Sequence, residues 1–515
     1  MRFPIALLVM TWAASGVAIG ADRYTVIISD LHFGVGRVAG SEDWLPTEDF
    51  RWTRELKDFL ARLSTETADK TDLVIAGDMF ELWQPLVKND CDQPNHNLGC
   101  SAVEAKVRMG QVLTAHAEDI KELAEFSKLG TNTLQIVPGN HDAALFFPEV
   151  QAQVMEAFGD AAPRVTIATK GYWLSPDKKI FVEHGQQIGR DVNRFDRWPD
   201  PFIGSPLPRR LQKTWGEQFV QSFFNQYEEK YPVIDNISDS GGISYGLTAE
   251  GLKGTGMAFG KFLRFYLAGS SWAQFASSLG EAAGETLPEW DFDRIRADGD
   301  VFFYLSVPKD DPMRSVAEAA YESGSLGITL SDLTDAEIES ICESRQALYL
   351  QQTRETPHSQ PTIGPCASKQ RLGAAMQAFF GPARDKLVKA RAQELVKALK
   401  DNGTLTKPFD LYVYGHTHNA LAPQPIRVDS SWTFEAVNSG AWQRIASPAQ
   451  FKALACGRVA AKALQIPLDR LPACYSVVRV KPYPVKPSSE LLYWSEAGGI
   501  GSLGPACSWT PPACP

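Results

Sequence analysis

The stretch Gly139-Asn140-His141-Asp142 directly follows the apolar run Thr133-Leu134-Gln135-Ile136-Val137-Pro138, and it decides how the rest of the chain is interpreted. Four more short motifs lie at or just past the end of a strand-like apolar run: Asp30-Leu31-His32, Gly77-Asp78, Glu183-His184-Gly185 and Gly415-His416-Thr417-His418. Each supplies carboxylate, amide or imidazole groups, which are ligands for divalent cations. Ligands bind beyond the carboxyl ends of strands in α/β sheets. We therefore expect these groups to meet at one metal site.

The fold predicted from the pattern is of the α/β (α+β) class, because strand-like runs alternate with helical spacing. Apolar runs predict strands over residues 24–29, 73–76, 134–137, 164–167, 180–182, 410–414, 432–437 and 475–480. Apolar residues at helical spacing predict helices over residues 50–63, 103–129 (as one long helix) and 371–399.

The length of 515 residues exceeds the size at which single cores usually stop growing. We expect a catalytic core in two parts, residues 22–189 and 410–480, separated by a large, mostly helical insertion or cap over residues 190–409. Residues 481–515 are rich in Pro, Gly and Ser, which predicts an irregular tail held by Cys507 and Cys514.

The first 21 residues have the features of a secretory signal peptide, with one charge at Arg2, an apolar stretch, and small residues before Asp22. An uncleaved anchor is the alternative, although the apolar stretch is short for a membrane span. Eight cysteines in an exported chain predict four disulfides, and a zinc site is disfavoured because no CxxC occurs. The simplest pairing is local in sequence: Cys91–Cys100, Cys342–Cys366, Cys456–Cys474 and Cys507–Cys514. We predict a periplasmic or secreted protein.

The formal net charge of −10 opposes a non-specific nucleic-acid binder, whose surface would be basic. It is compatible with a small phosphorylated substrate, because bound cations dominate the field at a metal site. The apolar run at residues 247–279 leaves membrane contact open. Lys261 and Arg264 interrupt that run and favour an amphipathic cap helix instead. No feature of the sequence indicates an oligomeric state.

The five motifs, in their order and strand-end placement, resemble those of the calcineurin-like metallophosphoesterase superfamily. The resemblance covers residues 24–185 and 410–445. It implies a four-layer β-sandwich of two sheets flanked by helices, and two divalent metal ions, for which Mn, Zn, Fe and Co all suit the ligands. The ligands that it implies are Asp30, His32, Asp78 and His418 for one ion, and Asp78, Asn140, His184 and His416 for the other.

The resemblance also implies the reaction, which is hydrolysis of a phosphomonoester, phosphodiester or pyrophosphate by a metal-bridging hydroxide. His141 would donate a proton to the leaving oxygen or stabilise the transition state, and Asp142 would orient His141. A non-catalytic binding protein with the same fold is an alternative, but it would be expected to have lost ligands. A nuclease is a second alternative, opposed by the acidic balance and the signal peptide.

Two details bear on the substrate, which we expect to be nucleotide-linked or lipid-linked if it is more than a simple phosphate ester. The stretch Gly77-Asp78-Met79-Phe80-Glu81-Leu82-Trp83 is similar to that of UDP-diacylglucosamine pyrophosphatases, which are shorter and act on the cytoplasmic side. Glu81 stands where purple acid phosphatases have a ligand tyrosine, so a tyrosinate-iron centre is not expected, and Glu81 would support the ligands or start a helix.

Three basic residues are candidates for binding a substrate phosphate, or for pairing with nearby aspartates on the surface: Arg190, Arg194 and Arg197. His96, His116 and His358 are interpreted as ordinary surface or helix residues.

Overall fold

The computed structural model describes residues 22–38, 40–41, 43–84, 91, 98–188, 193–203, 209–238, 382–497, 500–507, 509–511 and 514. Several sequence-based predictions lie outside these residues: the signal peptide, the apolar run 247–279, most of the insertion, Arg190, His96, His358, and the pair Cys342–Cys366.

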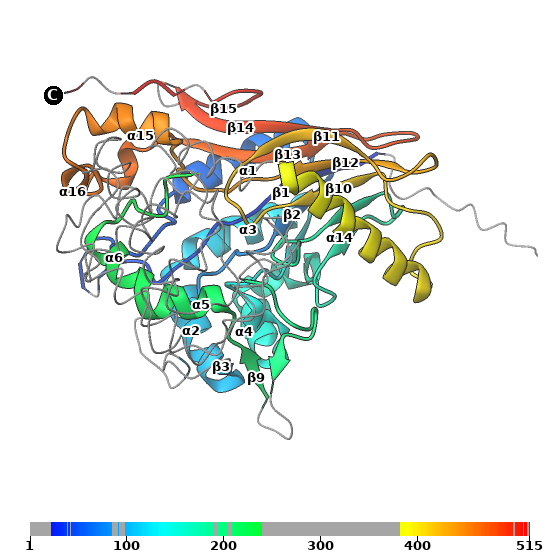
Figure 1. Cartoon of the computed structure of the whole chain (residues 1–515), viewed down its shortest axis with the longest axis horizontal. Coiled ribbons are helices and arrows are strands. Elements are labelled where there is room, and N and C mark those ends of the chain that lie inside the picture. Colours follow the sequence, from blue (N-terminus) through cyan, green and yellow to red (C-terminus); the bar gives the residue numbers. More distant parts are fainter. Residues whose placement is uncertain are drawn as a thin grey trace, which may run out of the picture.

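The largest sheet has seven strands in the order β15-β14-β13-β1-β2-β4-β5 (Figure 1). Its parallel part is β1 (Tyr24–Ile28), β2 (Thr71–Ala76), β4 (Thr133–Val137) and β5 (Val165–Ile167). It continues through antiparallel pairings with β13 (Cys474–Val480), β14 (Ser489–Ala497) and β15 (Ile500–Gly504).

A second sheet has the order β11-β12-β10-β7-β6, and a small third sheet has the order β3-β9-β8. The second sheet contains β6 (Trp173–Leu174), β7 (Ile180–Val182), β10 (Leu411–Tyr414), β11 (Leu421–Arg427) and β12 (Thr433–Asn438). The third contains β3 (Leu98–Ser101), β8 (Phe202–Ile203) and β9 (Arg210–Gln212). Strands β7, β10 and β12 are parallel. The predicted α/β class is confirmed.

Helices connect and cover the sheets. The α-helices are α1 (Thr53–Thr67), α2 (Ala102–Ala115), α3 (Ala117–Lys128), α4 (Pro148–Phe158), α5 (Trp215–Phe219), α6 (Asn225–Lys230), α14 (Pro382–Asp401), α15 (Pro448–Ala455) and α16 (Ala460–Ala463). Short turns of other helix types are η2 (Ala143–Phe146), η3 (Gly159–Arg164), η4 (Val220–Phe224) and η5 (Leu468–Arg470).

The two large sheets share an apolar core, in which Ile27 and Val74 of the first sheet pack with Val413 of the second. Successive side chains of a strand point to opposite faces. Ile28 accordingly belongs to the core formed with α1, α3 and α4, and Tyr412 to the core formed with α14. Both sheets thus place the carboxyl ends of their parallel strands around one region. This is the framework on which the site is built.

The prediction of one long helix over residues 103–129 is wrong, because the chain forms α2 and α3 with a break at His116. His116 is also not an ordinary surface or helix residue, since only 1% of it is exposed. Its Nδ1 lies 2.8 Å from Asp119 Oδ2 and its Nε2 lies 3.3 Å from Glu48 Oε1. Glu48 in turn accepts hydrogen bonds from the backbone amides of Gly36 and Phe50. The three side chains therefore fix the loop that follows β1.

We expect this arrangement to make stability depend on pH. Burial alone would lower the pKa of His116, but Glu48 and Asp119 raise it to about 9. The stabilisation is then complete below the unfolded value of about 6.5 and is lost as the pH rises through about 9. His116→Gln should lower the free energy of unfolding by roughly 3 kcal/mol at pH 6 and by much less at pH 10. Denaturant titrations at both pH values measure this difference, and equal deficits would contradict the assignment.

The C-terminal tail is not irregular, contrary to the prediction for residues 481–515. Strand β14 pairs with β13 along its length, Trp494 is almost completely buried, and β15 adds one more strand. Leu491 to Trp494 form a continuous apolar run, in which Leu492 and Trp494 are buried and supply the packing that Pro and Gly content obscured.

The disulfides connect this tail to the core. The predicted bond Cys91–Cys100 is confirmed, whereas Cys456 bonds to Cys514 and Cys474 bonds to Cys507. The predicted pairs Cys456–Cys474 and Cys507–Cys514 are therefore wrong, because β14 and β15 bring the tail back beside β13. Disulfides indicate an oxidising compartment. Among the described residues, none of the helices combines the length and the apolar character that crossing a bilayer requires.

Peptide mapping without reduction should yield cross-linked peptides containing Cys456 with Cys514 and Cys474 with Cys507. Replacing Cys474 and Cys507 by Ser should lower the free energy of unfolding by about 2–4 kcal/mol, because the bond closes a loop of 33 residues. A peptide joining Cys456 to Cys474 would contradict this connectivity.

Candidate metal centre

Each predicted ligand lies just beyond the carboxyl end of a parallel strand. Asp30 and His32 follow β1, Asp78 follows β2, and Asn140 follows β4. In the second sheet His184 follows β7, and His416 and His418 follow β10.

Five of these residues have positive φ, an uncommon conformation for any residue except glycine. They are Asp30 (53°), His32 (50°), Asp78 (50°), His416 (74°) and His418 (54°). Backbone strain of this kind concentrates at functional sites. The left-handed turn redirects each side chain out of the strand and into the space between the two sheets' ends.

The first group consists of Asp30, His32 and His418, whose ligand atoms lie within 4.8 Å of one another. The Nε2 atoms of the two histidines are 3.2 Å apart, and His418 Nε2 lies 3.3 Å from Asp30 Oδ1. Asp30 is completely buried, and its Oδ1 has no hydrogen-bond partner among the described residues.

The second group consists of Asp78, His184 and His416, again with ligand atoms within 4.8 Å. His184 Nε2 lies 2.8 Å from Asp78 Oδ2 and 3.0 Å from Asn140 Oδ1. Asp78 Oδ2 also lies 3.9 Å from His32 Nε2 of the first group. Asp78 therefore stands between the two groups.

The Nδ1 atoms of His184 and His32, which point away from the site, each contact an oxygen atom of the surrounding protein. His184 Nδ1 donates to the carbonyl oxygen of Ala76 at 2.9 Å, and His32 Nδ1 lies 3.0 Å from Glu81 Oε2. A proton on Nδ1 leaves the lone pair of Nε2 directed into the site, as in histidines that bind metals. Gly77 and Gly139 permit this packing, because a Cβ at either position would collide with His184 or Asp78 respectively.

These groups fit divalent cations. The buried carboxylates of Asp30 and Asp78 face imidazole nitrogens. Asp30 Oδ1 has no hydrogen-bond partner among the described residues, and such an oxygen is costly to bury unless something positive binds it. Burial would lower the pKa of His184, but Asp78 and Asp30 raise it to about 10, so without a metal ion this imidazole carries a proton beside the two carboxylates. Metal ions bind neutral imidazole, so they would replace protons here.

Glu81 is the buried carboxylate that joins His32 to His141. Its Oε2 lies 2.5 Å from His141 Nδ1, and the ring of His141 stacks on Trp83 with centroids 3.7 Å apart. Burial would raise the pKa of Glu81, but His141 and His32 lower it to about 2. Glu81 is thus an anion that supports two site histidines, and it does not start a helix.

Asp142 does not orient His141, contrary to the expectation from the sequence. Its carboxylate accepts hydrogen bonds from the backbone amides of Gly139 (2.6 Å), Met79 (2.9 Å) and Phe80 (3.3 Å). Asp142 therefore ties the loop after β2 to the loop after β4. Its contribution is to hold Asp78 and the Asn140 loop in register.

Two of the three predicted substrate arginines are among the described residues, and both have local partners. Arg194 donates to the carbonyl oxygen of Gln187 at 2.9 Å. Arg197 donates to the carbonyl oxygen of Phe202 and lies 3.2 Å from Asp200, with 64% of its side chain exposed. The contacts of Arg197 are those of a surface ion pair.

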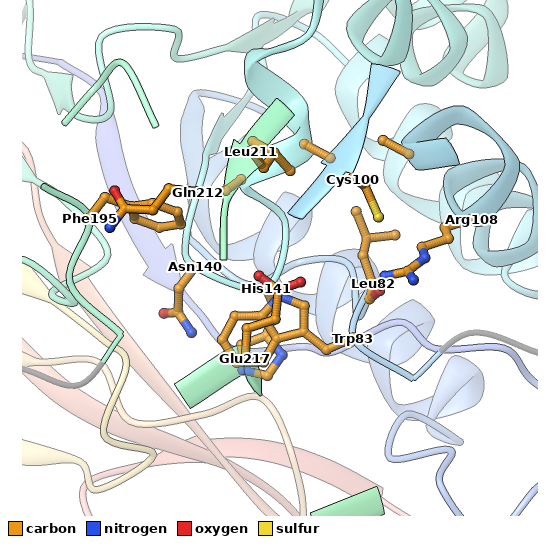
Figure 2. A pocket seen from close by; sticks show the side chains of 13 residues that line it. Leu82, Trp83, Cys100, Arg108, Asn140, His141, Phe195, Leu211, Gln212 and Glu217 are labelled. Carbon is orange, nitrogen blue, oxygen red and sulfur yellow. Dashed lines mark hydrogen bonds between the residues drawn. The ribbon is translucent and has the colours of Figure 1, made fainter. Parts of the chain in front are cut away.

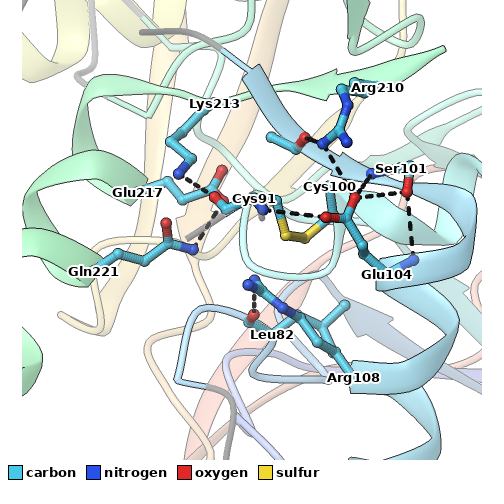
Figure 3. The surroundings of a disulfide bond; sticks show 11 residues. Leu82, Cys91, Cys100, Ser101, Glu104, Arg108, Arg210, Lys213, Glu217 and Gln221 are labelled. Atoms are coloured by element: carbon cyan, nitrogen blue, oxygen red, sulfur yellow. Dashed lines mark hydrogen bonds and ion pairs between the residues drawn. A yellow bond between two sulfur atoms is a disulfide. The ribbon is translucent and has the colours of Figure 1, made fainter. Parts of the chain in front are cut away.

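A pocket borders the site on the His141 side (Figure 2). Its lining includes Leu82, Trp83, Phe195 and Leu211, together with Asn140 and His141. Cys100 also lines the pocket and is bonded to Cys91. Lys213 donates to the carbonyl oxygen of Cys91, and the Cys91 amide donates to Glu104 (Figure 3).

Sequence reasoning missed the pair of Glu183 and Arg391. Both Oε atoms of Glu183 accept hydrogen bonds from Arg391 of α14, at 2.9 and 2.8 Å, next to His184 in the chain. An acidic residue directly before a motif histidine was the only available signal, and nothing in the sequence indicated its partner 208 residues away.

Comparison with known proteins adds no relative: the chain matches no protein-family model, no curated protein and no solved structure. The motifs and the geometry of the site therefore carry the functional argument alone.

Proposed function

We propose that this protein is an exported metal-dependent phosphoesterase of the calcineurin-like superfamily, which hydrolyses a phosphomonoester, phosphodiester or pyrophosphate. The observation that carries the proposal is the convergence of Asp30, Asp78 and four histidines on one buried site, with Asp78 between the two ligand groups. Two facing sheets with helices on their outer sides are also the arrangement that the superfamily resemblance implies.

Two groups of ligands suit two divalent ions, which when bound neutralise phosphate oxygens and acidify water. Asp30, His32 and His418 would hold one ion; Asn140, His184 and His416 would hold the other; Asp78 would serve both. His141 would protonate the leaving oxygen, held in place by Glu81 and by the face of Trp83.

The proposal is tested by hydrolysis of a small panel after removal of metals with a chelator. The panel is p-nitrophenyl phosphate, bis-p-nitrophenyl phosphate and a nucleoside diphosphate-sugar, each assayed with Mn, Zn, Fe or Co restored. Metal-dependent turnover of at least one compound is expected. A protein that takes up metals but hydrolyses none of them would favour the non-catalytic binding protein.

A further inference from the structure

A third group of acidic side chains lies outside the metal centre described above. It consists of Asp49, Glu228 and Asp235, whose carboxylate oxygens lie within 4.8 Å of one another. Asp49 is 4% exposed and Glu228 is completely buried, while Asp235 is partly exposed. Three carboxylates at this distance repel one another strongly unless protons or a cation intervene.

An independent observation points to a ligand. The side chain of Gln84 is 8% exposed and its Nε2 donates to Glu228 Oε2 at 2.6 Å, so the amide is directed at the acidic group. Yet Gln84 Oε1 has no hydrogen-bond partner among the described residues. The same holds for Glu228 Oε1, Asp49 Oδ1 and Asp235 Oδ1. A buried amide oxygen and three carboxylate oxygens without partners are acceptors that lack a positive group.

Among the described residues, Arg51 attracts Asp49, and His418 and His32 attract Asp235. The guanidinium of Arg51 donates to the backbone carbonyls of Glu48 and Leu45. Burial, followed by repulsion from Asp235, raises the pKa of Asp49 and of Glu228 well above the usual range.

We propose that Asp49, Glu228, Asp235 and the amide oxygen of Gln84 bind a calcium ion. All four groups offer oxygen and none offers nitrogen or sulfur, which selects a hard cation. Calcium accepts irregular coordination by about 6–8 oxygens, including water, and the exposed edge of Asp235 gives water and the ion access. Magnesium demands a more regular octahedron of ligands, so this group should bind it more weakly than calcium.

The ion would join parts of the chain that are distant in sequence. Asp49 lies in the loop after β1, Gln84 follows the Asp78 loop, and Glu228 and Asp235 belong to the start of the predicted insertion. Electrostatic interactions reach from this group to Glu81, His32 and His418. Calcium would therefore fasten the start of the insertion beside the metal centre, whatever reaction that centre catalyses.

The test is calcium titration of the full-length protein after its metal centre has been loaded with Mn²⁺. We expect one equivalent of calcium per chain by calorimetry and a rise of the melting temperature by a few degrees. Glu228→Gln should lose both signals. Glu229→Gln, which changes the same charge on an exposed neighbour, should keep them.

A further variant keeps the test decisive. Asp235→Asn replaces a partly exposed ligand and should also lose the calcium signals, in case Glu228→Gln does not fold. The proposal is overturned if the wild type takes up no additional calcium, or if Glu228→Gln and Asp235→Asn bind it as the wild type does.

Discussion

Asp78→Asn is expected to remove bound metal and to reduce hydrolysis by about 10³-fold or more, since every ligand group depends on this carboxylate. Asp78 Oδ2 lies 2.8 Å from His184 Nε2 and 3.9 Å from His32 Nε2. Asparagine preserves the size of the side chain and tolerates the φ of 50° at this position. It can also still accept the hydrogen bond from the His141 amide, which goes to Asp78 Oδ1. The substitution thus removes the negative charge and little else.

Metal content and turnover of the purified variant measure this outcome, with Asp160→Asn as the matched control. Asp160 is an exposed residue of η3, and its substitution should leave both quantities unchanged. An Asp78→Asn protein that retained two metal ions and normal turnover would show that Asp78 does not link the two groups.

His141→Ala is expected to leave metal content unchanged and to slow turnover by about 10²- to 10⁴-fold, the usual contribution of a general acid. The imidazole lies outside both ligand groups but touches the carboxylate that supports His32, with His141 Nδ1 2.5 Å from Glu81 Oε2. Its loss removes the proton donor, while Glu81 still holds His32.

Glu81→Gln is the informative comparison, because Glu81 contacts both His141 and His32. This variant should slow turnover and also weaken metal affinity by about 10- to 100-fold, as loss of a group behind a metal-binding histidine typically does. Titration of metal into both variants separates the two effects. If His141→Ala turned over its substrate at the normal rate, the assignment of His141 as proton donor would be wrong.

Local patterns predicted much of this fold and site. Continuous apolar runs marked β1, β2, β4 and β10 within one or two residues, because strands buried on both faces need apolar side chains throughout. The motifs at the ends of these strands carry Asp and His side chains that the fold brings into groups able to hold a metal ion. Their meeting followed from the rule that parallel strands present their carboxyl ends on the same side.

Long-range pairing was not predictable from these patterns. The carboxylate that contacts His141 is Glu81 and not the predicted Asp142, because which carboxylate reaches His141 depends on the left-handed turns at Asp78 and His32. The disulfides of Cys456 and Cys474 depended on a tail that forms β14 and β15. His116, buried between Glu48 and Asp119, interrupted a helix that its neighbours would have continued.

The central claim is that two metal ions lie at the ends of these strands, and anomalous diffraction from crystals grown with Mn²⁺ or Zn²⁺ tests it most directly. We predict two anomalous peaks, one contacting Asp30, His32 and His418, the other contacting Asn140, His184 and His416, with Asp78 between them. Crystals of protein saturated with either metal that showed no peak at these residues would contradict the account.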